Sequence, residues 1–450
     1  MFQKSASFFT VIFTLICGFV MADTQPTAEN INSNNGLSHN TVRCMLQDKT
    51  GFLWFGTLNG LNRYDGVRIK SYIPDAVNPT SLSSGKIKEV HEDNLGHIWV
   101  RTYSDMMHCY DPLTENFIAL FEHKSDLKIK HNLYYQDREN NIWLGSATDG
   151  CVRIAFDEER KPVTTFFGTT RENKIQSDVV YDIFEDSHSN TWILTQKGLS
   201  NYNRTTNTTT SVFNNRKFVK ALEIKNQVFF IADKGEIYSY NAQRKSLEFS
   251  CKLPLGSSAN KSTVFNNKLL ITTFGQGVYI VDPFKKQIIS TDFLLNEHIG
   301  GNANIQIDNQ QNIWIYNLTG KVWLFSPHKN KIIKLDLIPA SILQLIDEER
   351  YQFYADKTGN VWISTYGNGL FCYNIKSEGI SHYIYDKNGG GLSSNYLLSV
   401  ILDKNKNIWV GTESMGVNKL SFKKQNVQII YPDAENANKN VNVVKAFLED

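Results

Sequence analysis

An Asp stands six residues before a Trp at seven places in the chain, and this spacing restricts the fold more than any other feature. The pairs are Asp48/Trp54, Asp93/Trp99, Asp137/Trp143, Asp186/Trp192, Asp308/Trp314, Asp356/Trp362 and Asp403/Trp409. Two weaker copies, with Phe229 and Leu270 at the Trp position, fill the one long gap. The units recur at intervals of about 44 residues, a period typical of β-propeller blades or of helical repeats.

The pattern within one unit favours strands over helices. In the first unit, residues 42–47, 52–57, 61–65 and 68–73 are short β-branched and aromatic runs separated by Gly- and Asn-containing turns. No convincing amphipathic helical run is present. We therefore predict an all-β chain, a β-propeller of four-stranded antiparallel blades. We expect each motif Asp to accept hydrogen bonds from the turn backbone, and each Trp to pack between neighbouring blades.

The number of units suggests how the blades are divided. The seven units from Trp54 to Trp314 predict one seven-bladed ring within residues 23–335, and Trp362 and Trp409 begin a second, incomplete propeller over residues 336–450. A single nine-bladed ring is the alternative, although it lies outside the usual range. Residues near 29–33 are expected to supply the outermost strand of the last blade. Residues 443–450 resemble an inner strand that stops at a motif Asp, so we expect the chain to be cut in mid-blade.

The first 22 residues have the three zones of a secretory signal peptide: Lys4, an apolar run over residues 8–20, and a cleavage position after Ala22. The remaining cysteines, Cys44, Cys109, Cys151, Cys251 and Cys372, are odd in number and widely spaced, which favours core residues over disulfides or a zinc site. The 47 basic and 45 acidic residues nearly cancel, so nothing indicates a nucleic-acid partner.

The repeat resembles the two-component-regulator propeller repeat. The resemblance lies in the Leu-Ser-x-Asn lead-in, the strand that ends in Asp, the Gly-x-Leu-Trp-x-Gly-Thr core and the following Gly-Leu-Asn-Arg-Tyr-Asp at residues 60–65, and it extends over about residues 36–450. The match is close at Gly56-Thr57 and Gly411-Thr412, and it fails at Leu194-Thr195 and Tyr316-Asn317. The resemblance implies the periplasmic sensor region of a Bacteroidetes hybrid two-component system, in which propellers precede a membrane helix and a histidine kinase.

Little in the sequence indicates catalysis. The seven motif carboxylates occupy equivalent turns of separate blades, too far apart for paired acid–base work, and the histidines show no metal-ligand spacing. We predict no catalytic residue, no metal and no cofactor. The second unit departs from the repeat at Arg101, Tyr103 and Asp105, and Tyr366 and Asn368 occupy the related turn near Trp362. Aromatic and bidentate polar groups suit sugars, so these five residues are our candidate ligand-binding residues.

The expected function is therefore a non-enzymatic, periplasmic sensor of oligosaccharides from complex glycans, which controls the genes for their use. The resemblance further implies a homodimer formed through downstream domains, and a membrane anchor outside these 450 residues. Two other functions remain open at this point. One is a propeller enzyme, such as a lyase or a quinone-dependent dehydrogenase, and the other is a scaffold that binds proteins.

Overall fold

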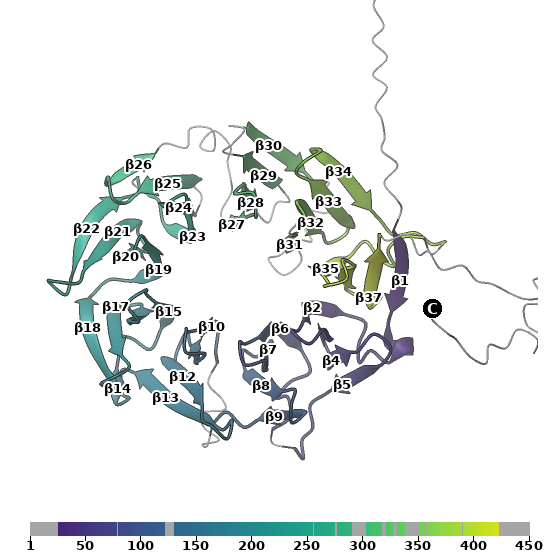
Figure 1. The fold of residues 1–450 in the computed structure, drawn as a ribbon, viewed down its shortest axis with the longest axis horizontal. Coiled ribbons are helices and arrows are strands. Elements are labelled where there is room, and N and C mark those ends of the chain that lie inside the picture. Colours follow the sequence, from purple (N-terminus) through teal and green to yellow (C-terminus); the bar gives the residue numbers. More distant parts are fainter. Residues whose placement is uncertain are drawn as a thin grey trace, which may run out of the picture.

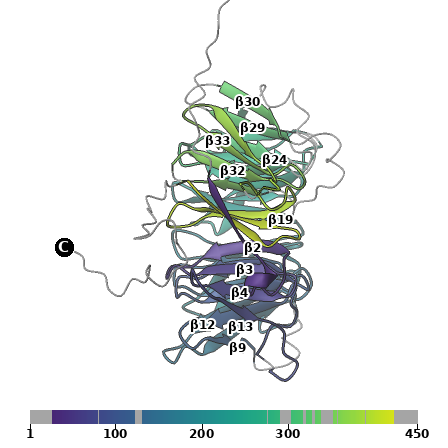
Figure 2. The ribbon, with the colours of Figure 1, turned by 90° about the vertical axis from the view of Figure 1, so that its right-hand side faces the viewer.

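The computed structural model describes residues 26–422, except for 79, 122–129, 255, 275–276, 290–302, 317–320, 327–330, 338–351, 357 and 389. In this part of the chain, the strands form nine sheets that follow one another around a ring (Figure 1). Seen from the side, the ring is a flat disc (Figure 2). The chain is therefore an all-β propeller of antiparallel four-stranded blades, as the repeat predicts.

The blades are numbered from 1 to 9 in chain order, and within each blade the first strand lies nearest the ring axis (Figure 1). Blade 1 contains β2 (Val42–Gln47), β3 (Leu53–Thr57), β4 (Gly60–Tyr64) and β5 (Ile69–Tyr72); blade 2 contains β6 (Ile87–Glu92), β7 (Ile98–Thr102), β8 (Met107–Asp111) and β9 (Asn116–Ile118); and blade 3 contains β10 (Leu133–Gln136), β11 (Ile142–Gly145), β12 (Cys151–Phe156), β13 (Pro162–Gly168) and the short parallel strand β14 (Asn173–Lys174).

The next three blades repeat this order. Blade 4 contains β15 (Val180–Glu185), β16 (Thr191–Thr195), β17 (Gly198–Asn203) and β18 (Thr208–Asn214); blade 5 contains β19 (Phe218–Ile224), β20 (Gln227–Ala232), β21 (Glu236–Asn241) and β22 (Ser246–Lys252); and blade 6 contains β23 (Ala259–Phe265), β24 (Lys268–Thr273), β25 (Val278–Asp282) and β26 (Gln287–Ile289). Phe229 and Leu270 lie on the second strands of blades 5 and 6, where Trp stands in the other blades.

The last three blades bring the two ends of the described chain together. Blade 7 contains β27 (Asn304–Ile307), β28 (Ile313–Tyr316), β29 (Lys321–Ser326) and β30 (Lys331–Asp336); blade 8 contains β31 (Gln352–Ala355), β32 (Asn360–Ser364), β33 (Leu370–Asn374) and β34 (Gly379–Tyr383); and blade 9 contains β35 (Leu397–Leu402), β36 (Ile408–Thr412), β37 (Val417–Ser421) and, as its outermost strand, β1 (Thr27–Ile31). A short 3-10 helix, η1 (Ser33–Asn35), follows β1.

The N-terminal strand closes the ring. β1 pairs antiparallel with β37, with Glu29 opposite Lys419 and Ile31 opposite Val417, and it lies beside β37 in Figure 1. The position overlaps the residues near 29–33 that the sequence indicates for this role. Because β1 occupies the outer edge of blade 9, this blade has four strands, as the others do except the five-stranded blade 3. The signal-like residues 1–22 and the end at 443–450 lie outside the described residues.

The prediction of a seven-bladed ring followed by a second propeller is wrong, because the structure shows nine blades in one ring. The reason lies in the contacts after blade 7. Trp314 of blade 7 packs against Val361 and Ile363 of blade 8. The contact with blade 1 comes instead from blade 9, where Trp409 shares a cluster with Met45 and Phe55. The local repeat sets how neighbouring blades pack, but the number of blades depends on where the ring closes.

The motif Asp and Trp are joined directly. In all seven motif units the indole Nε1 donates to a carboxylate oxygen of the Asp, at distances of 2.7 to 3.2 Å. The other Asp oxygen accepts turn N–H groups, such as Gly51 N at 2.8 Å from Asp48 Oδ1. Each carboxylate therefore closes its own turn and positions the Trp that fills the gap to the next blade.

The motif tryptophans pack between neighbouring blades, as the sequence predicts. Trp99 shares an apolar cluster with residues of blade 3, and Trp143 shares one with residues of blade 4. Trp192 belongs to a cluster that continues into blade 5. The indole of each motif unit therefore joins its own sheet to the following one, and apolar burial holds successive blades together.

The turns also link one blade to the next. The residue after a motif Asp donates its backbone N–H to a side chain near the end of the next blade's inner strand: Lys49 to Glu92, Asn94 to Gln136, Arg138 to Glu185, Ser187 to Glu223 and Lys404 to Gln47. The Lys404 link joins blade 9 to blade 1. The face of the ring that carries these turns is called the motif face below.

Candidate ligand-binding site

The repeat residues that the sequence singles out are structural and do not form a binding surface. Trp99, Trp143 and Trp192 are fully buried, with 0% of each side chain exposed, so none of them can contact a ligand. The motif carboxylates are also buried, and they are occupied by their own indoles and turns. The sequence finds these positions because they recur, and they recur because every blade needs the same packing and the same turn.

The predicted residues Arg101, Tyr103 and Asp105 lie at the end of β7, on the face opposite the motif face, and Arg101 is fully engaged. Its guanidinium donates from Nε to Glu89 Oε2 at 3.0 Å and pairs with Glu89 Oε1 and Asp105 Oδ1. Only 7% of Arg101 is exposed. Burial alone would raise the pKa of Glu89, but hydrogen bonds from His91 and Arg101 outweigh it and lower the pKa to about 2. Arg101 is therefore a buried guanidinium held by two partly exposed carboxylates.

Tyr103 connects this network to blade 1. Arg43, on the inner strand β2, donates from NH1 to the Tyr103 hydroxyl at 2.6 Å, and its guanidinium carbon lies 5.0 Å from the centre of the Tyr103 ring. The Lys88 ammonium lies 5.9 Å from the same ring centre. The tyrosine ring thus has two cations near its centre. The sequence argument missed Arg43, Lys88 and Glu89, which are on neighbouring inner strands.

The other two predicted residues do not join this group. The Tyr366 hydroxyl donates to Glu413 Oε2 at 2.6 Å, and Asn368 Nδ2 donates to the backbone oxygen of Leu337 at 2.7 Å. Both lie in blade 8, which blades 9 and 1 separate from blade 2. The structure therefore does not gather the five predicted residues into one site, and their role in ligand binding stays a prediction.

A feature that the sequence argument did not use is a bulge near the start of the inner strands. The strand register shifts between Val42 and Cys44, Ile87 and Glu89, Val180 and Asp182, Phe218 and Lys220, Ala259 and Ser262, and Leu397 and Ser399. The residues inside the shifts include Arg43, Lys88, Tyr181 and Lys261. Bulges redirect side chains and are frequent near functional sites. Four of these strands belong to units with a motif Asp. In each of them, the residue inside the register shift lies five positions before that Asp.

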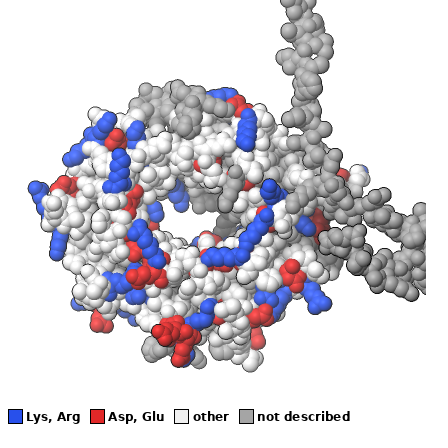
Figure 3. Space-filling view, viewed as in Figure 1, with Lys and Arg blue, Asp and Glu red and all other residues white. Residues whose placement is uncertain are grey.

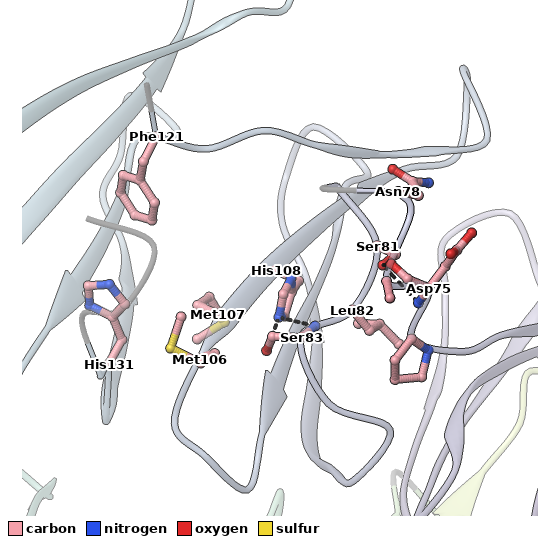
Figure 4. A pocket seen from close by; sticks show the side chains of 12 residues that line it. Asp75, Asn78, Ser81, Leu82, Ser83, Met106, Met107, His108, Phe121 and His131 are labelled. Atoms are coloured by element: carbon pink, nitrogen blue, oxygen red, sulfur yellow. Dashed lines mark hydrogen bonds between the residues drawn. The ribbon is translucent and has the colours of Figure 1, made fainter. Parts of the chain in front are cut away.

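Next to Asp105 a pocket of about 390 Å³ opens between blades 1, 2 and 3. Figure 4 shows His131 and Phe121 on one side, Met106 and Met107 between, and His108 with the loop of Asp75 to Ser83 on the other. The wall is mainly apolar and carries a few polar groups. Its volume falls within the range of about 300–1,000 Å³ for small-molecule sites. We call it the His131 pocket.

The two histidines of the His131 pocket have different surroundings. The Ser83 N–H donates to His108 Nε2 at 3.2 Å, so this nitrogen is an acceptor and Nδ1 carries the proton. His131 stacks on Phe121 with ring centres 6.1 Å apart. Only 1% of His131 is exposed, and neither of its ring nitrogens has a hydrogen-bond partner among the described residues. Burial lowers the pKa of each histidine to about 4, so both are neutral near pH 7.

Other kinds of site find less support within the described part of the chain. The residues described include no group of three or more His, Cys, Asp and Glu placed to hold a metal ion. All five cysteines that follow the signal-like segment are free thiols. No helix among the described residues is long and apolar enough to cross a bilayer.

The two component regulator propeller family model matches residues 36–59 and 391–414. These segments lead into the second strands of blades 1 and 9, on the two sides of the ring closure. No curated protein matches the chain significantly.

Solved structures resemble the chain only distantly. The extracellular domain of the putative hybrid two component system BT4673 from B. thetaiotaomicron is 17% identical, with 87% of this chain and 54% of that chain covered and a TM-score of 0.45. The corresponding domain of BT3049 from B. thetaiotaomicron is 19% identical, with coverage of 87% and 65% and a TM-score of 0.28. Virginiamycin B lyase from Staphylococcus aureus is 11% identical, with coverage of 88% and 99% and a TM-score of 0.40.

The chain spans about half the length of the BT4673 domain. Scores this low carry no argument about function, so the family model is the informative match. Its two segments fall on the Asp, Trp and Gly-Thr positions of the repeat that recurs around the ring. The chain therefore carries two segments, in blades 1 and 9, that match the two component regulator propeller repeat.

Proposed function

We propose that this chain is the ligand-sensing part of a two-component signalling protein, and that it detects oligosaccharides released from complex glycans. The observation that carries the proposal is the match of blades 1 and 9 to the two component regulator propeller model. The proposal places the ring in the periplasm, tethered by a membrane helix outside these residues. In this proposal, the full-length protein forms a homodimer through its downstream domains. It then controls the genes for glycan use.

The His131 pocket supports a sugar as the ligand class. The partly buried His108 offers its Nδ1–H as a donor, and the exposed Asp75 and Asn78 offer further polar groups, all of which suit sugar hydroxyls. Phe121 supplies an aromatic wall beside His131, and Met106 and Met107 supply apolar surface.

A signal requires more than binding. A ligand shifts a conformational equilibrium only by its difference in affinity for the two arrangements. The His131 pocket spans loops of three neighbouring blades, and a ligand there contacts groups whose spacing changes when the blades move relative to one another. Its binding energy would then favour one arrangement of the blades.

The test is a thermal-shift and calorimetric screen of the chain against neutral oligosaccharides of defined length. We expect at least one to bind, and His108→Phe to weaken it by up to about tenfold through loss of the Nδ1–H donor. His188→Phe, in an exposed turn of blade 4, is the matched control and should leave affinity unchanged. If no saccharide binds, or if both substitutions act alike, the proposal is wrong for this pocket.

A further inference from the structure

A second hollow lies at the inner edge of blades 3 to 6, on the face opposite the motif face. Its volume is about 740 Å³. The residues that give it its character are Tyr181, Lys217, Lys220, Lys261 and Phe274, and we call it the basic hollow. Figure 3 shows Lys and Arg side chains gathered along the inner margin of the ring. None of these residues belongs to the His131 pocket, which opens between blades 1 to 3.

The three lysines are not equivalent. Lys220 forms an ion pair with the buried Asp182 at 2.9 Å, and the backbone N–H of Ala221 donates a hydrogen bond to the same carboxylate. The charge of Lys220 is therefore neutralised within the protein. Lys217 lies over the Tyr181 ring with its Nζ 4.5 Å from the ring centre. Lys261 is exposed. Neither Lys217 nor Lys261 has a carboxylate at ion-pair distance among the described residues. Two ammonium groups are therefore available to a ligand.

The rest of the lining suits a sugar ring. Phe274 is 50% exposed just past the end of blade 6's second strand, and the partly buried Tyr181 lies in the bulge of blade 4. Such aromatic faces pack against the apolar faces of sugars, while polar groups fix orientation. Asn260, Ser262 and Asp233 also line the hollow and provide groups for hydroxyls. The volume exceeds what an inorganic anion alone would fill.

We propose that the basic hollow binds a saccharide that carries a carboxylate, with the acid group between Lys217 and Lys261 and the sugar ring against Phe274. The inference rests on the proposed function, because it takes the ligand to be an oligosaccharide, and it adds the charge class of that ligand. Asp233 also lines the basic hollow, and it has no ion pair among the described residues. In this arrangement its carboxylate accepts hydrogen bonds from the hydroxyl groups of the sugar ring.

The experiment compares a galacturonate trisaccharide with the matched galactose trisaccharide by titration calorimetry on the whole chain. We expect the acidic sugar to bind about tenfold or more tightly, and its affinity to fall as salt rises. The double variant Lys217→Gln/Lys261→Gln should lose this preference. The double variant Lys174→Gln/Lys285→Gln removes the same charge from exposed positions on the outer part of blades 3 and 6, and it should keep the preference.

The outcomes separate this inference from the proposed function. If the neutral sugar binds as well as the acidic one, or the preference survives in Lys217→Gln/Lys261→Gln, the basic hollow is not a carboxylate site, while saccharide sensing stands. If neutral oligosaccharides bind and the galacturonate does not, the inference is equally wrong. If no saccharide of either class binds, both the inference and the proposed function are contradicted.

Discussion

Gly416 lies so close to Ile31 that a Cβ on the glycine would stand 2.1 Å from the Ile31 carbonyl oxygen. The two residues come from opposite ends of the described chain and meet where β1 joins β37. Gly416 also has a positive φ of 74°, which side chains rarely adopt. The contact explains why a glycine is needed here: it lets the N-terminal strand approach the outer edge of blade 9.

Replacing this glycine therefore tests ring closure. Gly416→Ala should lower the free energy of unfolding by more than Gly51→Ala. Gly51 has a similar positive φ of 106°, but a Cβ there meets nothing within 4 Å. Both changes incur the backbone penalty of about 1 kcal/mol, and only the first adds a clash with a strand from the other end of the chain. Urea unfolding of the two variants measures the difference, and equal losses would argue against the β1 contact.

Lys404 provides a second link across the closure. Its Nζ donates to the backbone oxygens of Asp48 at 2.9 Å and Lys49 at 2.6 Å. Lys404→Ala should therefore cost about 1–2 kcal/mol of stability, because two hydrogen bonds from a charged donor are lost. Lys387→Ala, at an exposed turn of blade 8, is the control and should fall within about 0.5 kcal/mol of the parent. Thermal unfolding of both variants would show whether the Lys404 link contributes.

The indole hydrogen bond of the motif can be separated from packing. Trp54 donates to Asp48 Oδ2 at 2.7 Å, whereas the Nε1 of Trp323 has no hydrogen-bond partner among the described residues. Both side chains are almost fully buried. Trp54→Phe should cost about 1–3 kcal/mol more than Trp323→Phe, because only the first leaves a buried carboxylate oxygen without its indole donor. Chemical denaturation of the pair tests this, and similar losses would mean that the motif Trp acts through packing alone.

His131 should make stability depend on pH. Burial lowers its pKa to about 4, while the unfolded chain has a value near 6.5, so the unfolded state binds more protons between these values. Stability is therefore complete above about pH 6.5 and falls as the pH decreases toward 4, by up to about 3 kcal/mol from this residue. His131→Phe should flatten this part of the profile. Unfolding measured from pH 7 to 4.5 tests it, and parallel profiles for parent and variant would contradict the assignment.

The sequence predicted the blades well because each is a local structure. The spacing of Asp48 to Trp54 is short enough to be set within one turn and one strand, so its recurrence located seven of the second strands. The strands that carry Phe229 and Leu270 were located instead by the glycines of the turns that follow them, Gly235 and Gly277. The predicted number of blades in the ring was wrong. That number depends on whether Trp314 meets blade 8 or blade 1, a contact between residues far apart in the chain.

The candidate site was harder to predict for a related reason. Arg101 was chosen because it departs from the repeat, but its partner Glu89 is on the adjacent strand, and the sequence does not show that the two would pair. The bulge residues Arg43, Lys88 and Tyr181 share a position relative to the motif Asp, yet they differ in chemistry, and this difference conceals the pattern. His131 belongs to no sequence motif that would have singled it out. Its isolation from hydrogen-bond partners is visible only in three dimensions.

The central claim is that nine blades form one ring closed by the N-terminal strand. It is tested most directly by zero-length carbodiimide cross-linking of the unmodified chain, followed by mass spectrometry of the linked peptides. Glu29 and Lys419 form an ion pair at 3.2 Å across the β1–β37 contact. Glu115 and Lys70, at 2.7 Å between blades 1 and 2, provide the internal control. We predict that both links are recovered. Recovery of the Lys70–Glu115 link without the Glu29–Lys419 link would contradict the closed nine-bladed ring.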